Sequence, residues 1–210
     1  MRNKAGIACM ILGAALIFGA LGLFLHNQCE EAAAGEAVME VLPQVVQQIQ
    51  INQQAHLLTE EPEQTLPLQS PEETQPVQEM ETMEIDGNWY IGCLSIPSLG
   101  LELPVMADWS DAQLKTAPCR YAGSTFTDDL VIMAHNYVHH FGKLVHLSIG
   151  DRVVFVDASG LVTEYEVVAL DVLKQTDVED MTAGEYDLTL FTCTFSGSSR
   201  TTIRCDRVEE

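Results

Sequence analysis

A cysteine, a histidine and an arginine each stand at the end or the beginning of a predicted β-strand. Residues 188–193 alternate between two faces and predict a strand that ends at Cys193. A small polar loop follows, and β-branched residues after Arg200 predict a second strand. His135 ends a third apolar run, residues 130–135. If the first two strands pair, the thiol and the guanidinium lie within reach of each other.

These three side chains have the chemistry that acyl transfer requires. A cysteine thiolate is a strong nucleophile, and a nearby cation favours it over the thiol. A guanidinium keeps its charge and can hold an oxyanion, while an imidazole can give and take a proton. We therefore interpret Cys193 as the nucleophile, His135 as the general acid and base, and Arg200 as the group that stabilises the oxyanion or the substrate. Arg204, on the same face of the strand, is the second candidate for the arginine, and a buried structural role is the alternative for Cys193.

The motif around the cysteine resembles that of the sortases, the cysteine transpeptidases on the surface of Gram-positive bacteria. The resemblance extends over about residues 85–208 and is carried by Thr189-Leu190-Phe191-Thr192-Cys193, by Arg200, and by Ala134-His135-Asn136. It implies an all-β fold, an eight-stranded sortase-type β-barrel with short helices. It places Arg200 where the family's arginine opens the final strand. It also makes Thr192, Ala134 and Asn136 candidate substrate contacts.

By this resemblance the chain is expected to be a membrane-anchored cysteine transpeptidase. It would cleave an LPxTG-like sorting motif through a thioacyl intermediate on Cys193 and transfer the protein to an amine. The expected partners are sorting-signal-bearing surface proteins or pilins, and the amine of a peptidoglycan precursor. The alternatives are a hydrolytic cysteine peptidase at the cell surface and a non-catalytic surface adaptor. In papain-like peptidases the cysteine precedes the histidine, whereas here His135 comes first.

The N-terminal residues 1–26 predict a membrane anchor. Residues 5–25 contain no charged side chain, and a helix of this length spans roughly the 30 Å hydrocarbon core of a bilayer. Arg2 and Lys4 precede this span and acidic residues follow it, so the positive-inside rule predicts a cytoplasmic N-terminus and an extracellular catalytic domain. A cleaved signal peptide is the alternative, because residues 32–34 offer a small-residue cleavage site.

Residues 27–84 are rich in Glu, Gln and Pro and contain no Lys or Arg, which predicts a flexible acidic stem. Apolar residues between Val38 and Ile49 recur at helical spacing, but Pro43 lies inside that pattern. A transient helix in a disordered tether is the favoured interpretation, and a docking helix is the alternative. From residue 59 to residue 82 no core is expected. The stem is accordingly expected to be dispensable for catalysis.

Residues 85–210 are predicted to form the catalytic domain, with eight short strands and turns between them. Short helices are expected at residues 110–116, where Ser110 can cap, and at residues 141–147. Residues 157–160 predict a hairpin turn. The expected strands span 89–96, 101–106, 120–122, 130–135, 152–156, 162–170, 188–193 and 200–208.

Composition argues against several other functions. The net charge of −21 and the absence of a basic patch argue against nucleic-acid binding. No cofactor and no metal are expected: the spacing of His139, His140 and His146 favours surface histidines, and the acidic loop over residues 177–187 is interpreted as solvated. Among the six cysteines, free buried thiols are favoured over a disulfide for Cys93, Cys119 and Cys205.

Overall fold

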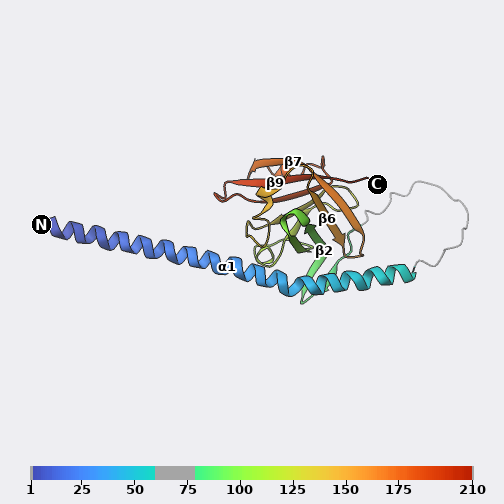
Figure 1. The fold of residues 1–210 in the computed structure, drawn as a ribbon, viewed down its shortest axis with the longest axis horizontal. Coiled ribbons are helices and arrows are strands. Elements are labelled where there is room, and N and C mark those ends of the chain that lie inside the picture. The colour runs from blue at the N-terminus through green and yellow to red at the C-terminus, as the bar shows by residue number, and fades with distance from the viewer. Residues whose placement is uncertain (1, 60–78, 210) are drawn as a thin grey trace, which may run out of the picture.

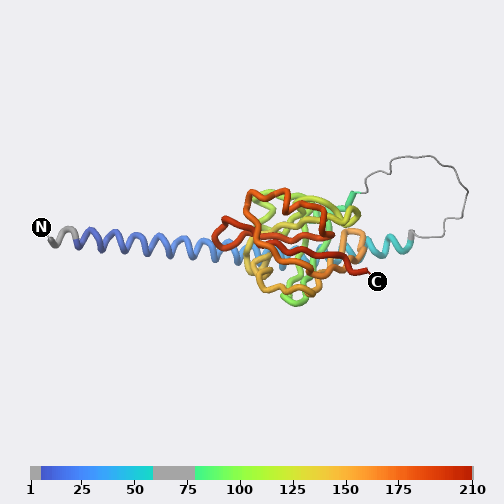
Figure 2. The backbone as a smooth tube through the Cα atoms, turned by 90° about the horizontal axis from the view of Figure 1, so that it is seen from above, coloured from blue at the N-terminus to red at the C-terminus, as the bar shows by residue number. Residues whose placement is uncertain are grey.

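The computed structural model describes residues 2–59 and 79–209. It consists of one long helix, α1 (Arg2–Thr59), and a β-barrel that lies beside the C-terminal half of this helix (Figures 1 and 2). In both views the N-terminal half of α1, drawn in dark blue, projects beyond the barrel. The projecting half is therefore not packed against the barrel, while the other half is part of the folded domain.

Eight strands of mixed direction form the barrel, as predicted. Their order is β2-β3-β4-β5-β8-β9-β7-β6, and pairing of β2 with β6 closes the ring. The β3–β4 and β5–β8 pairs are parallel. A short additional strand, β1 (Met83–Ile85), pairs with β2 outside the ring. The ring consists of β2 (Asn88–Ile96), β3 (Leu101–Met106), β4 (Cys119–Ala122), β5 (Leu130–Ala134), β6 (Arg152–Asp157), β7 (Val162–Lys174), β8 (Leu188–Cys193) and β9 (Ser199–Arg207).

The alternation of side chains along β8 explains how this strand separates a core from a functional face. Leu188 and Leu190 point into the barrel interior, where they pack with Ile203 of β9. Phe191 points to the outer face and packs there with Val131. This confirms the predicted facing of the strand, and burial of each large interior side chain contributes about 1.5–3 kcal/mol to stability.

The segments between the strands contain single turns of helix. The expected helices at residues 110–116 and 141–147 are shortened to 3-10 turns, and Ser110 Oγ accepts the N–H of Gln113 at 3.2 Å, as a capping residue does. The predicted hairpin turn is present: Asp157 Oδ1 accepts the N–H groups of Ser159 and Leu161, both at 2.9 Å. The short helices are η1 (Pro97–Leu99), η2 (Gln113–Lys115), η3 (Leu144–His146) and α2 (Val178–Thr182).

The C-terminal half of α1 differs from the predicted flexible stem. Residues 27–59 continue the helix, and Ala34, Val38, Val45 and Ile49 are buried against the barrel. Their spacing places them on one face of the helix, so the hydrophobic burial of this face stabilises a segment whose composition alone predicts disorder. Pro43 is on the exposed side. A proline removes one backbone hydrogen bond and bends a helix without ending it, and Figure 1 shows α1 bending beneath the barrel.

The N-terminal half of α1 keeps its apolar side chains exposed. Large apolar residues from Ile7 to Leu25 are 49–76% exposed, and the helix is long and apolar enough to cross a membrane, as a signal sequence also would be. The stretch from residue 59 to residue 82, where no core was expected, lies largely outside the described residues, which resume at residue 79. In the described part the expectation is wrong for Met80, which is 7% exposed and packs in the hydrophobic core.

Candidate active site

The three predicted catalytic residues lie on adjacent strands at one end of the barrel. β5 and β8 run parallel with Ala134 opposite Thr192, so the next residues, His135 and Cys193, leave the two strands side by side. β8 and β9 run antiparallel with Cys193 opposite Arg200. Neighbouring strands are about 4.8 Å apart, so each residue starts one strand spacing from the next. The strand register therefore brings the three together in the order histidine, cysteine, arginine.

The site lies on the outer face of the barrel. Cys193 points to the same face as Phe191, because side chains two residues apart in a strand share a face. Phe191 packs against Met181 and makes an edge contact with Tyr121, whose ring centroid is 5.3 Å away. Cys193 itself is half-buried. The thiol is thus reachable from solvent while its neighbour on the strand sits in an apolar layer.

A cavity of about 140 Å³ opens beside the thiol. Its walls come from the ends of β8 and β9, from the loop after β5 and from η3. Phe195, in the turn between β8 and β9, is 95% exposed at its rim. Such a cavity can hold part of an extended peptide against the sulfur. The lining residues are Asn136, Gly142, Val145, Thr192, Cys193, Thr194, Phe195 and Thr201.

Two of the candidate substrate contacts also hold the strands together. The buried Thr192 hydroxyl donates a hydrogen bond to the carbonyl oxygen of Ala134 at 2.8 Å. This bond joins β8 to β5 directly beside Cys193 and His135, so it fixes the separation of the two strand ends. Asn136 and Thr192 line the cavity, whereas Ala134 is buried behind it. Contact of these residues with a substrate stays a prediction.

Arg200 lies opposite Cys193 in the strand register, although it is not among the residues that line the cavity. Nη1 donates to the carbonyl oxygens of Gly197 and Ser199, both at 3.1 Å, within the turn that follows Cys193. The Nε and Nη2 groups make no hydrogen bond to the described residues. The side chain is half-buried and opposite Cys193 in the register, and contact of its remaining N–H groups with a bound carbonyl or oxyanion stays a prediction.

Arg204, the second candidate, has a structural role instead. It is 3% exposed, and its Nη1 donates to the carbonyl oxygen of Met181 at 3.2 Å and to Thr189 Oγ1 at 3.0 Å. Its Nε pairs with Asp171 Oδ2 at 3.4 Å. These bonds attach the segment that contains α2 to the outer face of β8 and β9. A guanidinium that is buried and engaged in this way is not available to a substrate.

The loop that carries His135 folds tightly back on itself. The N–H of Gly142 donates to the carbonyl oxygen of Tyr137 at 2.8 Å. Glycine is required there, because a Cβ at position 142 would lie 2.5 Å from the carbonyl oxygen of Asn136. The Tyr137 ring lies between two imidazoles, with centroids 4.8 Å from His135 and 5.6 Å from His140. The compact loop and the ring contacts hold the His135 side chain beside the end of β8.

Burial and neighbouring charges lower the pKa of both imidazoles. Partial burial lowers the pKa of His135 below its usual value, and the nearby Lys115 cation lowers it further, while Glu30 and Asp111 oppose the change. His140 was expected at the surface but is fully buried, and burial lowers its pKa to about 4. His140 is therefore neutral at physiological pH, and His135 stays the candidate for proton exchange with a substrate.

Charged residues from α1 and η2 complete this side of the site, and the sequence did not reveal them. Lys115 Nζ contacts Glu30 Oε1 of α1 at 2.9 Å. Glu31 Oε1 accepts the N–H of Val138, three residues after His135, at 3.0 Å. The helical spacing of Val38 and Ala34, continued one turn back, reaches the two glutamates, and this was the sequence signal that could have placed them against the barrel.

The remaining cysteines and acidic residues have other environments. Cys93, Cys119 and Cys205 are buried free thiols, and burial raises the pKa of Cys93 and of Cys119 to about 12. In the acidic loop before β8, Asp187 Oδ2 accepts the N–H of Arg207 at 2.6 Å. Among the described residues no group of three or more His, Cys, Asp or Glu side chains could hold a metal ion.

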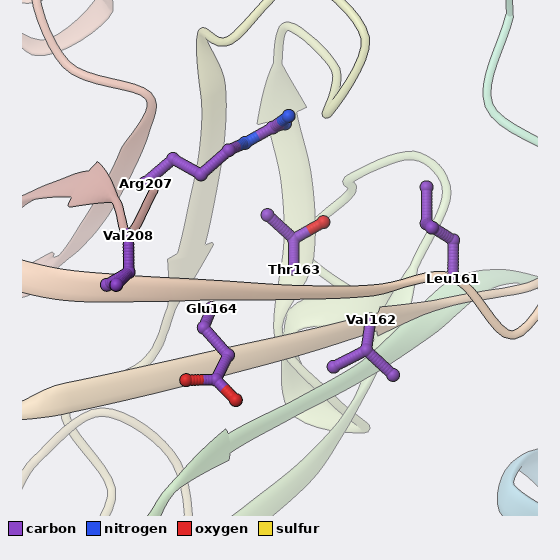
Figure 3. A pocket seen from close by; sticks show the side chains of 6 residues that line it. All are labelled: Leu161, Val162, Thr163, Glu164, Arg207 and Val208. Atoms are coloured by element: carbon purple, nitrogen blue, oxygen red, sulfur yellow. The ribbon is translucent and has the colours of Figure 1, made fainter. Parts of the chain in front are cut away.

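A second hollow lies at the other end of β9, away from Cys193 (Figure 3). Arg207 points away from Glu164 in this view, donates to the carbonyl oxygen of Thr125 at 2.7 Å, and pairs with Asp128 at 2.6 Å. Its guanidinium is thus engaged within the fold. The hollow is lined by Leu161, Val162, Thr163, Glu164, Arg207 and Val208, and this lining contains no cysteine or histidine.

Comparison with known proteins identifies a matching family and similar folds. A family model described as the sortase domain matches residues 94–208. Sortase C1 of Streptococcus agalactiae is a similar solved structure, with 25% identity, a TM-score of 0.53, and coverage of 60% of this chain and 72% of that chain. Sortase C1 of Streptococcus suis is 26% identical, with a TM-score of 0.50 and coverage of 58% and 74%.

Sortase A of Corynebacterium diphtheriae has a similar fold, with 24% identity, a TM-score of 0.51, and coverage of 59% of this chain and 62% of that chain. No curated protein sequence matches the chain. The similar structures include both sortase A and sortase C1 proteins, so the comparisons do not assign a class.

Proposed function

Because the chain belongs to the sortase family and is therefore a cysteine transpeptidase, we propose that it cleaves an LPxTG-like sorting motif with Cys193, His135 and Arg200. It then transfers the sorted protein to an amine of a cell-wall precursor or of a pilin. The observation that carries the assignment of residues is the strand register: His135 directly follows β5, Cys193 ends β8, and Arg200, the second residue of β9, is opposite Cys193.

The first half of the reaction forms a thioester. The Cys193 thiolate adds to the carbonyl carbon of the motif's threonine, and the oxyanion that forms is held by the free N–H groups of Arg200. When this intermediate collapses, the threonine–glycine C–N bond breaks. The leaving amine takes a proton from the protonated His135, so the imidazole becomes neutral.

The second half returns the enzyme to its starting state. An incoming amine attacks the thioester carbon and gives a proton to the neutral His135. The C–S bond breaks and Cys193 leaves as a thiolate. The working pair is therefore a thiolate with an imidazolium. The lowered pKa of His135 means that only part of the enzyme carries this pair at neutral pH.

The chain is anchored by α1 with its N-terminus in the cytoplasm and the barrel outside. Arg2 and Lys4 precede the apolar span and acidic residues follow it, as the positive-inside rule requires. From Leu25 to Glu30 the helix advances only about 7 Å. Because Glu30 contacts Lys115 at the active-site end of the barrel, this end faces the membrane from which α1 emerges.

The experiment uses the full-length chain in detergent micelles, a library of sorting peptides, and an added amine such as triglycine. A transpeptidase yields an amide between the cleaved peptide and the amine, as measured by mass spectrometry, and the Cys193→Ala variant yields none. Cleavage that gives only the free acid at a high amine concentration would instead identify a hydrolytic cysteine peptidase. A chain that releases no peptide from any motif would match the surface adaptor.

A further inference from the structure

α1 meets the barrel first at its active-site end. Glu30 and Glu31 contact the barrel near His135, whereas Asn52, six turns later, donates to the carbonyl oxygen of Ala158 at 2.8 Å in the hairpin at the other end. The helix thus runs along the barrel from the catalytic end to the opposite end. The first residues beyond the apolar span are consequently the ones beside the catalytic histidine.

Three contacts connect this part of α1 to the histidine loop and to η2. Glu31 Oε1 accepts the Val138 N–H at 3.0 Å, and Glu30 Oε1 accepts from Lys115 Nζ at 2.9 Å. The helix backbone itself lies against the loop, because a Cβ on Gly35 would lie 2.8 Å from Cδ2 of His139. The loop therefore has α1 on one side and the end of β8 on the other.

We propose that Glu30 and Glu31 of α1 are positioning residues of the active site. Glu31 holds the loop that carries His135 through the Val138 amide. Glu30 neutralises Lys115, which would otherwise place an uncompensated cation beside the imidazole. The segment that follows the membrane span is thus part of the catalytic apparatus, and a barrel separated from it has a less ordered and less readily protonated histidine.

The pKa of His135 depends on all the charged groups around its ring. Lys115 opposes protonation of the imidazole, and Glu30 and Asp111 favour it. Removing the Glu30 charge leaves Lys115 acting alone from that side, so the pKa of His135 falls further. Removing the Lys115 charge raises it. The titratable and charged groups around the ring are Glu30 of α1, Asp111 and Lys115 near η2, Tyr137 and His140 of the loop, Cys193 of β8 and Arg200 of β9.

The first test measures the imidazole directly. In the full-length chain in micelles, with isotope-labelled histidine, the His135 ring signal is identified by its loss in His135→Gln and followed against pH. We expect Glu30→Gln to lower the titration midpoint, Lys115→Gln to raise it, and the double variant to lie near the wild type. Glu36→Gln is the matched control, since Glu36 lies on the exposed face of α1 and its side chain makes no hydrogen bond or ion pair with the described residues.

The second test separates the hydrogen bond from the charge. Glu31→Ala removes the acceptor for Val138, so we expect kcat for a sorting peptide to fall about five- to tenfold, the worth of one hydrogen bond, with KM unchanged. Glu31→Gln keeps an acceptor oxygen at the same place and should restore most of the rate. Glu36→Ala should behave as the wild type, and equal melting temperatures show that each variant is folded.

The inference rests on the proposed function only in taking His135 as catalytic. It is overturned if the His135 midpoint in Glu30→Gln equals that in Glu36→Gln, or if Glu31→Ala has the kcat of Glu36→Ala. If the wild type cleaves no peptide, the proposed function fails, and the histidine titration still decides whether Glu30 and Lys115 govern the imidazole.

Discussion

The burial of one face of α1 predicts a large difference between two isoleucines that are two residues apart. Ile49 is 6% exposed and packs against the barrel, whereas Ile51 is 50% exposed. Truncating Ile49 to alanine removes three carbon atoms from a nearly dry contact, at about 0.8 kcal/mol each. With the cavity that remains, the free energy of unfolding falls by about 2–4 kcal/mol.

Truncating Ile51 to alanine removes carbon atoms that are already about half exposed to solvent. We expect Ile51→Ala to cost less than about 1 kcal/mol, because alanine also has the higher helix propensity. For a domain of this size 1 kcal/mol corresponds to about 2–4 °C. The melting temperature should therefore fall by roughly 4–16 °C for Ile49→Ala and by a few degrees at most for Ile51→Ala.

The assay is thermal unfolding of the full-length chain in micelles, followed by near-ultraviolet circular dichroism, which reports the packing of the barrel's aromatic residues. If residues 27–59 were a flexible tether, neither variant would change the barrel's transition. Equal melting temperatures for Ile49→Ala and Ile51→Ala would refute the docking of α1. If Ile49→Ala is destabilised, we expect a fragment that begins near residue 82, which lacks this contact, to be less stable than the full-length chain.

The remaining predictions concern charge, pH and thiol exposure. Arg200→Ala and Arg200→Lys should both lower kcat about 10² to 10³-fold without a change in melting temperature, because both substitutions remove directed N–H groups. Arg204→Ala should mainly lower the melting temperature. Burial lowers the pKa of His140 to about 4 in the folded chain, so below pH 6.5 the unfolded state binds more protons than the folded state. The free energy of unfolding should therefore fall as the pH drops from 6.5 to 4, by up to about 3 kcal/mol from this residue. Urea titration should show this loss in the wild type and a smaller one in His140→Gln. In whole cells of a Cys29→Ser strain, a membrane-impermeant thiol reagent should label Cys193, and labelling only after cell lysis would contradict the extracellular placement.

The strands of the catalytic site could be predicted because their pattern is local. β8 has the bounds that alternation predicts, 188–193, and its two faces are as expected. β9 begins one residue earlier than predicted, at Ser199. The choice of Arg200 over Arg204 rested on the resemblance. The buried partners of Arg204 explain why an arginine on the same face, four residues further along, is unavailable.

The role of α1 could not be predicted, because its evidence is not local. A segment rich in Glu and Gln has the composition of a disordered tether. Its narrow apolar stripe stabilises the helix only because the barrel surface covers it. The contact between Glu30 and Lys115 joins residues 85 positions apart. Periodicity can indicate that a helix has an apolar face, but it does not identify which charged residues meet across the interface.

The most direct test of the central claim is the mass of the covalent intermediate. The full-length chain is mixed with a cleavable sorting peptide in the absence of an added amine, quenched in acid, and digested for mass spectrometry. We expect the N-terminal part of the peptide, ending at threonine, as a thioester on Cys193 and on no other cysteine, with no adduct in Cys193→Ala. Peptide cleavage that persists in Cys193→Ala, or an adduct on a different residue, would contradict it.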